Sequence, residues 1–228
     1  MTSGASLGPT ITPPIVAPSI LSADFSRLAE NLALVDPAQD WVHCDVMDGR
    51  FVPNLTFGPI VVRAVRRLSR ALVDVHLMIH EPLRLLSEFD AAGADGLTVH
   101  LEACQDLGRT LEAIRASGRR VGLALKPGTP LAEAEPHLRE LDLLLVMTVE
   151  PGFEGQAFLP AMLDKVRAAA AWRARHHGHF LIQVDGGIAP ATAREARLAG
   201  AEVFVAGHAI YRQADPRRAL EALRAAVD

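Results

Sequence analysis

Cysteine is scarce in this sequence, which has only Cys44 and Cys104 among 228 residues. Both lie in or beside apolar segments, where a reduced cysteine behaves as a small core residue. A disulfide framework of the kind that stabilises small secreted domains is therefore excluded, and a reducing, cytoplasmic setting is expected.

Positive charge is not in excess either, because 23 Lys and Arg stand against 27 Asp and Glu, a formal net charge of −4. A protein that grips nucleic acid needs a basic field, so we expect no nucleic-acid partner. No apolar run approaches the roughly 20 residues that cross a bilayer. Residues 1–14 lack the basic and apolar regions of a signal peptide. We therefore expect no membrane partner and a flexible N-terminal tail over residues 1–14.

Hydrophobic residues make up 50% of the chain, and they fall in short apolar runs that alternate with longer stretches at helical spacing. This alternation is typical of βα units. The short runs are apolar on both faces, as parallel strands covered by helices must be. At 228 residues the chain fits a single (β/α)8 TIM barrel, an α/β fold, over residues 15–228. The predicted strands are 15–21, 41–46, 72–78, 96–100, 120–125, 143–148, 180–185 and 203–206.

Capping residues, and prolines in the first turn, predict where several helices begin. These signals, together with apolar residues at three-and-four spacing, predict helices over residues 25–35, 60–68, 83–92 and 193–198. The remaining crossover segments follow the same rhythm with weaker boundaries.

Polar residues gather where several predicted strands end, which is where the reactive groups of a parallel barrel lie. His43 and Asp45 share one face of the second strand, His76 lies near the end of the third, and Asp185 ends the seventh. Each alone is also typical of a hydrogen-bonded core or rim residue. Burying two aspartates without a metal or a charged partner costs several kcal/mol. The four together predict a site for one divalent transition metal, with Zn, Mn, Fe(II) and Co all left open.

Glycine-bearing loops follow the last three predicted strands, at residues 151–155, 185–187 and 206–208. Exposed backbone N–H groups in such loops form the phosphate site that many barrels have after strands seven and eight. Any one of these loops is equally typical of an ordinary turn. Their common position predicts an anion site.

Longer motifs in the same places carry a family resemblance. They are Ala17-Pro-Ser-Ile-Leu-Ser-Ala-Asp-Phe, His43-Cys-Asp-Val-Met-Asp-Gly-Arg-Phe-Val-Pro-Asn-Leu-Thr-Phe-Gly, Asp74-Val-His-Leu-Met, Met147-Thr-Val-Glu-Pro-Gly-Phe-Glu-Gly-Gln-Ala-Phe and Val184-Asp-Gly-Gly-Ile. In order and spacing they resemble the signature segments of the ribulose-phosphate 3-epimerase family. The resemblance extends from about residue 15 to the C-terminal segment.

The resemblance implies a metal-dependent epimerase of the pentose phosphate pathway or the Calvin cycle, which interconverts D-ribulose 5-phosphate and D-xylulose 5-phosphate through an ene-diolate. It implies that Asp45 and Asp185 are the acid/base pair at C3 and bind the metal together with His43 and His76. It also implies a homo-oligomer that binds a small ketose phosphate and one divalent transition metal per chain. The implied substrate contacts are Ser19, Met47, His76, Met78, Met147, Gly152, Phe153, Glu154, Gly155, Gly186, Gly187, Gly207 and His208.

Two other functions stay open. A 3-epimerase of a related ketose phosphate, such as allulose 6-phosphate, would use the same acids and the same metal. A non-catalytic barrel that only binds a phosphosugar is the second alternative, although such a protein needs no metal held between two potential bases.

Two residues depart from the family pattern: Glu154 stands where glycine is usual, and His208 stands where a small residue, commonly serine, is usual. A carboxylate close to a phosphate dianion opposes its binding. We therefore expect the Glu154 side chain to point away from the anion and leave only its backbone N–H facing it. The His208 imidazole can donate to a phosphate oxygen.

Overall fold

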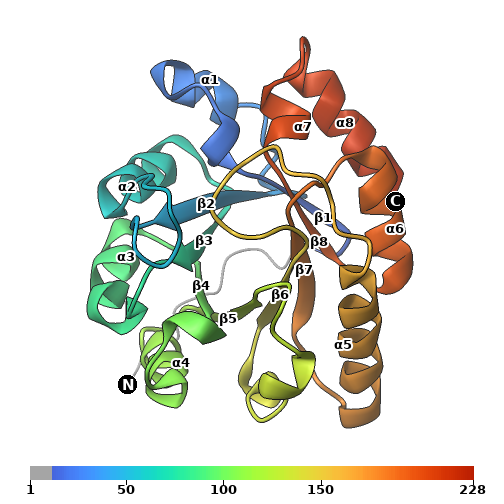
Figure 1. Ribbon diagram of the computed structural model, residues 1–228. Helices are drawn as coiled ribbons and strands as arrows, with labels where there is room; N and C mark the ends of the chain where they lie inside the picture. Colours follow the sequence, from blue (N-terminus) through green and yellow to red (C-terminus); the bar gives the residue numbers. More distant parts are fainter. Residues whose placement is uncertain (1–11) are drawn as a thin grey trace.

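The computed structural model describes residues 12–228, so most of the predicted tail, residues 1–14, lies outside the described part and stays a prediction (Figure 1). Eight parallel strands form one sheet in the order β1-β8-β7-β6-β5-β4-β3-β2. The strands are β1 (Ile15–Pro18), β2 (Trp41–Met47), β3 (Leu72–Met78), β4 (Gly96–His100), β5 (Arg120–Leu125), β6 (Leu143–Met147), β7 (Leu181–Asp185) and β8 (Val203–Ala206).

The two edge strands of this sheet, β1 and β2, meet and close it. Isolated parallel bridges join Val16 to Asp40 and Ser19 to His43. Every other neighbouring pair is joined by a parallel ladder. The predicted single (β/α)8 barrel is therefore confirmed.

The α-helices surround the barrel (Figure 1). Outward-facing strand residues such as Cys44 and Val46 belong to the same buried core as helix residues such as Val62 and Val65. In the described part of the chain, every helix falls short of the length and apolar character needed to span a bilayer. The helices are α1 (Leu28–Leu32), α2 (Pro59–Leu68), α3 (Leu86–Ala92), α4 (Leu107–Ala116), α5 (Met162–His176), α6 (Pro190–Ala199), α7 (His208–Tyr211) and α8 (Pro216–Val227).

The first βα unit differs from its prediction in two places. Strand β1 ends at Pro18 rather than at residue 21, because the chain turns into a 3-10 helix directly after Ser19. The Ser19 hydroxyl then accepts a hydrogen bond from the Leu21 N–H and caps a 3-10 turn, η1 (Ile20–Ser22). The helix predicted over residues 25–35 is a 3-10 turn, η2 (Phe25–Arg27), followed by the short α1.

The described segment between β5 and β6 contains no α-helix, although the βα rhythm predicts one there. Two 3-10 turns, η5 (Leu131–Glu133) and η6 (Leu138–Glu140), take its place. Pro136 lies between them, where its missing N–H and its ring prevent a continuous helix. The helix predicted over residues 83–92 likewise begins as a 3-10 turn, η3 (Pro82–Leu85), before α3.

The barrel interior is packed closely enough to require glycine on β5. A Cβ atom built at Gly122 would lie 2.1 Å from the Thr98 hydroxyl oxygen on β4 and 2.9 Å from the Thr98 Cα. Thr98 is itself paired in register with His76 on β3. The missing side chain at Gly122 therefore leaves the room that the Thr98 side chain occupies.

We expect Gly122→Ala to lower the free energy of unfolding by about 1–3 kcal/mol, because the added methyl overpacks the interior. Gly108→Ala is the matched control. Gly108 is exposed in α4 and an added Cβ there would only touch the Asp106 carboxylate at 3.8 Å. Since alanine favours a helix, that control should be stabilising by up to about 1 kcal/mol. Denaturant unfolding of both variants checks this, and equal stabilities would contradict the packing argument.

Candidate active site

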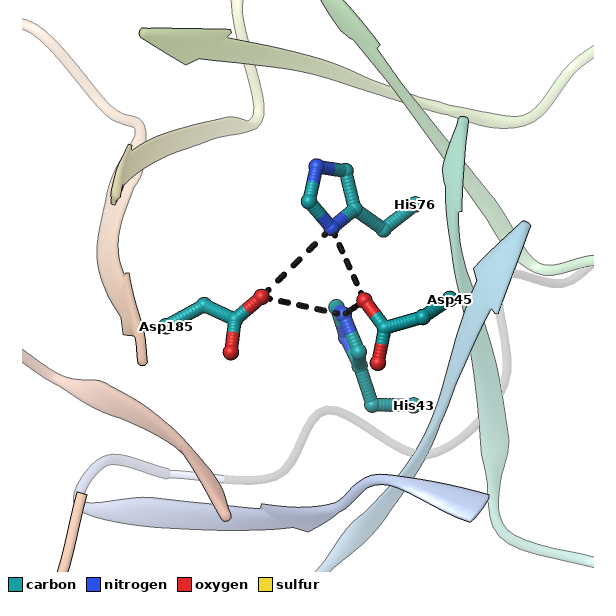
Figure 2. A group of neighbouring side chains, drawn as sticks. All are labelled: His43, Asp45, His76 and Asp185. Carbon is teal, nitrogen blue, oxygen red and sulfur yellow. Dashed lines mark hydrogen bonds and ion pairs between the residues drawn. The ribbon is translucent and has the colours of Figure 1, made fainter. Parts of the chain in front are cut away.

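Four polar side chains converge at the C-terminal ends of three strands, His43 and Asp45 from β2, His76 from β3 and Asp185 from β7 (Figure 2). One ligand atom from each residue lies within 4.8 Å of the others. The His76 Nδ1 is 3.1 Å from Asp45 Oδ1 and 3.5 Å from Asp185 Oδ2. The His43 Nε2 is 3.2 Å from Asp45 Oδ1 and 4.0 Å from Asp185 Oδ2. The structure thus brings together the four residues that the sequence singles out as metal ligands.

The register of β2 and β3 explains this convergence. Asp45 is paired with His76 and His43 with Asp74. Side chains alternate along a strand, so these residues share the inner face while Cys44 between them points into the outer core. The expectation that His43 and Asp45 share one face of β2 is confirmed.

The His43 ring is oriented by a carboxylate behind it. Its Nδ1 lies 2.8 Å from Asp74 Oδ2, and the same oxygen accepts a hydrogen bond of 2.7 Å from the Gln183 amide. An Nδ1–H that donates to Asp74 leaves Nε2 facing the cluster. Neither Asp74 nor Gln183 is among the site residues predicted from the sequence. The alternation that selects His76 puts Asp74 on the same face, two residues earlier, and was the available signal.

The His76 ring is oriented from the opposite side. Its Nε2 lies 2.8 Å from the Nε2 of His100, whose Nδ1 is 3.2 Å from Glu102 Oε2. Burial lowers the pKa of His100 to about 4, so this imidazole is neutral near pH 7. With its Nδ1–H donated to Glu102, the His100 Nε2 accepts the proton of His76 Nε2. His76 Nδ1 is then free to face the two aspartates. This support was also missed in the sequence.

The pKa values of the two aspartates are shifted in opposite directions by their surroundings. Burial raises the pKa of Asp45, but the adjacent His43 and His76 imidazoles outweigh it and hold that pKa well below its usual range. Burial and the negative charge of Asp45 raise the pKa of Asp185. Two carboxyl groups with such different environments suit one proton acceptor and one proton donor.

Burial and neighbouring charge also have opposite effects on the pKa values of the two imidazoles. Burial alone would lower the pKa of His43 and His76, yet the surrounding carboxylates raise both above the usual value for histidine. The centre of the cluster therefore favours positive charge. Two nitrogen and two oxygen donors around that centre fit a divalent transition metal.

A pocket of about 240 Å³ opens above the cluster. The His43 and His76 rings lie beneath it and are fully buried. The other predicted site residues line the pocket: Ser19, Asp45, Met47, Met78, Met147, Gly152, Phe153, Glu154, Gly155, Asp185, Gly186, Gly187, Gly207 and His208.

The expectation that the Glu154 side chain points away from the pocket is wrong. Its carboxylate accepts a hydrogen bond from the Ser22 hydroxyl, and Ser22 is 1% exposed and lines the pocket. Its second oxygen lies 3.1 Å from an Arg212 guanidinium nitrogen. Glu154 is not among the described residues with positive φ, so no strain requires a glycine there. The long-range partners Ser22 and Arg212 turn this side chain inward, and nothing in the local sequence shows them.

A closed parallel barrel that carries two carboxylates and two imidazoles at the C-terminal ends of its strands defines a (β/α)8-barrel enzyme. In this class the reactive groups lie at the ends of several different strands, which is where His43, Asp45, His76 and Asp185 lie here.

Comparison with known proteins narrows this class to one family. The model of the Ribulose-phosphate 3 epimerase family matches residues 15–211. The ribulose-phosphate 3-epimerase of Synechocystis sp. is 47% identical over 213 residues, which are 92% of this chain and 93% of that protein. The Bacillus subtilis enzyme is 46% identical over 211 residues, 92% and 97% of the two chains. The chain belongs to the ribulose-phosphate 3-epimerase family, and it is an isomerase that acts on carbohydrates.

Solved structures of more distant proteins share the fold. A crystal structure of 3-hexulose-6-phosphate synthase aligns with a TM-score of 0.64 over 95% of this chain and 100% of that chain, at 24% identity. At this identity the likeness supports the barrel architecture alone.

We expect Asp74→Asn to weaken Zn²⁺ binding by about 10–100-fold, because the amide no longer fixes the His43 ring as the carboxylate does. Competition with a chromophoric chelator measures the affinity. Asp164→Asn removes an exposed carboxylate, 84% accessible and outside the lining of the pocket, and serves as the control. An unchanged affinity in folded Asp74→Asn protein would show that Asp74 does not support the site.

Proposed function

We propose that this protein is a metal-dependent epimerase that interconverts D-ribulose 5-phosphate and D-xylulose 5-phosphate by proton transfer at C3. The observation that carries the proposal is the arrangement of Asp45 and Asp185, which face each other from β2 and β7 at the floor of one pocket (Figure 2). Membership of the family supports the choice of substrate.

His43, Asp45, His76 and Asp185 would hold the metal, one divalent ion of Zn, Mn, Fe(II) or Co per chain. Their mutual distances and the raised pKa values of both imidazoles support this assignment. The metal, when bound, supplies a fixed positive charge that stabilises the negative oxygens of an ene-diolate.

The two aspartates move the proton. The C3 hydrogen is acidic because it lies beside the C2 ketone, and a carboxylate on one face of the sugar removes it. The carboxyl group on the opposite face returns a proton there, which inverts C3. Asp45 and Asp185 suit these roles because they come from strands on different sides of the barrel and have oppositely shifted pKa values.

Ser19 positions one of these acids. Its hydroxyl donates a hydrogen bond of 2.5 Å to Asp45 Oδ2, while Asp45 Oδ1 faces the two imidazoles. The carboxylate is thereby held with one oxygen toward the metal ligands and the other beside the pocket. In the same position Ser19 can contact the sugar.

Methionines give the reacting carbons an apolar surrounding. Met47 and Met78 pack with Val52, and Met147 packs with Val149, on the pocket walls. Removing water from an active site strengthens its electrostatic interactions and prevents side reactions of the intermediate. We therefore assign Met47, Met78 and Met147 to the contact with the carbon chain.

The glycine loops take the phosphate. Gly186 and Gly187 have φ values of 116° and 66°, which favour glycine, and a Cβ at Gly187 would lie 2.5 Å from the Phe158 nitrogen. Their backbone approaches the loop after β6 closely and leaves no room for side chains. Backbone N–H groups of these loops and of Gly207, with the His208 imidazole, are the proposed donors to the phosphate oxygens.

A coupled assay on D-ribulose 5-phosphate and allulose 6-phosphate side by side, with metal content measured on the same sample, tests the function. We expect turnover of the pentose phosphate, about one metal per chain, and loss of activity after exhaustive chelation. Preference for allulose 6-phosphate would move the assignment to that substrate. Metal binding without turnover of either would indicate a phosphosugar-binding barrel, and full activity in verified metal-free protein would overturn the metal's role.

We expect Asp45→Asn and Asp185→Asn each to lower the rate of epimerisation at least about 100-fold, since each removes one of two proton carriers. In D2O each variant should still exchange the C3 hydrogen of one epimer, and the two variants should exchange opposite epimers. Magnetic resonance of the recovered sugar phosphate measures this. Near wild-type epimerisation in either variant, with metal bound, would contradict the two-acid scheme.

The cytoplasmic location and the homo-oligomeric assembly expected from the sequence stay predictions. So does the place in the pentose phosphate pathway. Centrifugation of the purified protein across a range of concentrations tests the assembly directly.

A further inference from the structure

The pocket proposed to receive a phosphate dianion is lined by carboxylates. Asp45 and Asp185 lie at its floor and Glu154 lies at its glycine-loop end. Among the described residues that line it, none is a lysine or an arginine, and His208 is the only further group that can carry positive charge beside the ligand histidines below. The phosphate therefore lacks a permanent counter-charge within the pocket itself.

One arginine lies immediately outside this end of the pocket. Arg212 follows α7, and its guanidinium nitrogen is 3.1 Å from Glu154 Oε1. The other Glu154 oxygen, Oε2, accepts from the Ser22 hydroxyl. Ser22 in turn lies against the phosphate loop, because a Cβ built at Gly207 would be 2.5 Å from Ser22 Oγ. The Glu154 carboxylate thus accepts from a hydroxyl and pairs with a guanidinium, at the place where the phosphate is expected.

We propose that the Glu154 carboxylate takes the place of the substrate phosphate in the free protein, and that the phosphate displaces it and binds the Ser22 hydroxyl and Arg212. Arg212 is then the cation that recognises the phosphate, and Glu154 sets how strongly the site discriminates against weaker anions. This inference rests on the proposed function, which supplies the phosphorylated ligand that makes the exchange.

The contacts that the phosphate has to replace are weak, and the loop that carries Glu154 contains glycines. The Glu154 and Arg212 side chains are 35% and 49% exposed, and ion pairs at such exposure are weak. A phosphate dianion offers three oxygens and about twice the charge, so it is the stronger partner for a guanidinium and a hydroxyl. Glu154 lies between Gly152 and Gly155, whose φ values are 132° and 74°, and glycines allow this loop to rearrange.

A fixed latch is the competing explanation. In that case the contacts of Glu154 with Ser22 and Arg212 hold the loop between β6 and α5 over the ligand and persist when it binds. The two explanations differ in sign. Exchange requires that loss of Glu154 tightens phosphate binding and loss of Arg212 weakens it, whereas a latch requires that both losses weaken it equally.

The experiment is calorimetric titration of inorganic phosphate into wild-type protein and into Glu154→Gln, Arg212→Gln and the double variant. We expect the Kd for phosphate to fall about three- to fivefold in Glu154→Gln and to rise about tenfold in Arg212→Gln. The double variant should lie between the two. Glu150→Gln, on the same loop but outside the pocket, and Arg217→Gln, exposed at the start of α8, are the charge-matched controls and should change Kd less than twofold.

Equal weakening in both single variants, with no further loss in the double variant, would establish a latch and overturn the exchange. An unchanged Kd in Arg212→Gln would remove Arg212 from phosphate recognition and overturn it as well. Because inorganic phosphate binding requires no turnover, an inactive protein with the expected pattern would refute the proposed reaction and leave the exchange standing. In active protein the KM for D-ribulose 5-phosphate should follow the phosphate Kd while kcat stays unchanged, since the phosphate is remote from C3.

Discussion

The unbroken register between β2 and β3 is the constraint on which the site depends. It runs from the pair of Trp41 and Leu72 to the pair of Met47 and Met78. Because side chains alternate, this one register puts two imidazoles and two carboxylates on the inner face together. A slip by one residue would turn Cys44 inward and bury the polar residues of β2 against the helices. The geometry of the cluster is therefore a property of the sheet rather than of any loop.

Carboxylates are in excess over imidazoles around the cluster. Asp45, Asp74 and Asp185 face two imidazoles, so the buried carboxylates outnumber the groups that can neutralise them. Each imidazole is held at its far nitrogen, His43 by Asp74 and His76 by His100. A divalent cation held by these four residues would offset the excess negative charge.

The features that could be predicted from the sequence are those that a strand encodes locally. Alternation along β2 places His43 and Asp45 on one face before any contact is known. Short apolar runs of suitable length predict the strands. The Glu154 side chain was placed wrongly because its partners, Ser22 and Arg212, are far away in the chain. The hydrogen bond from His76 to His100 joins two strands and cannot be read from either strand alone. The missing helix before β6 depends on Pro136, which lies outside the strands.

The closure of the barrel passes through the site. Strands β1 and β2 are joined by only two isolated bridges, one of which links Ser19 to His43, while every other seam is a continuous ladder. Seams with few backbone hydrogen bonds open at the lowest free energy. Because Ser19 also donates to Asp45, an opening of this seam would separate the hydroxyl from the carboxylate. A ligand that contacts both strands would therefore stabilise the closed barrel and the Ser19–Asp45 hydrogen bond together.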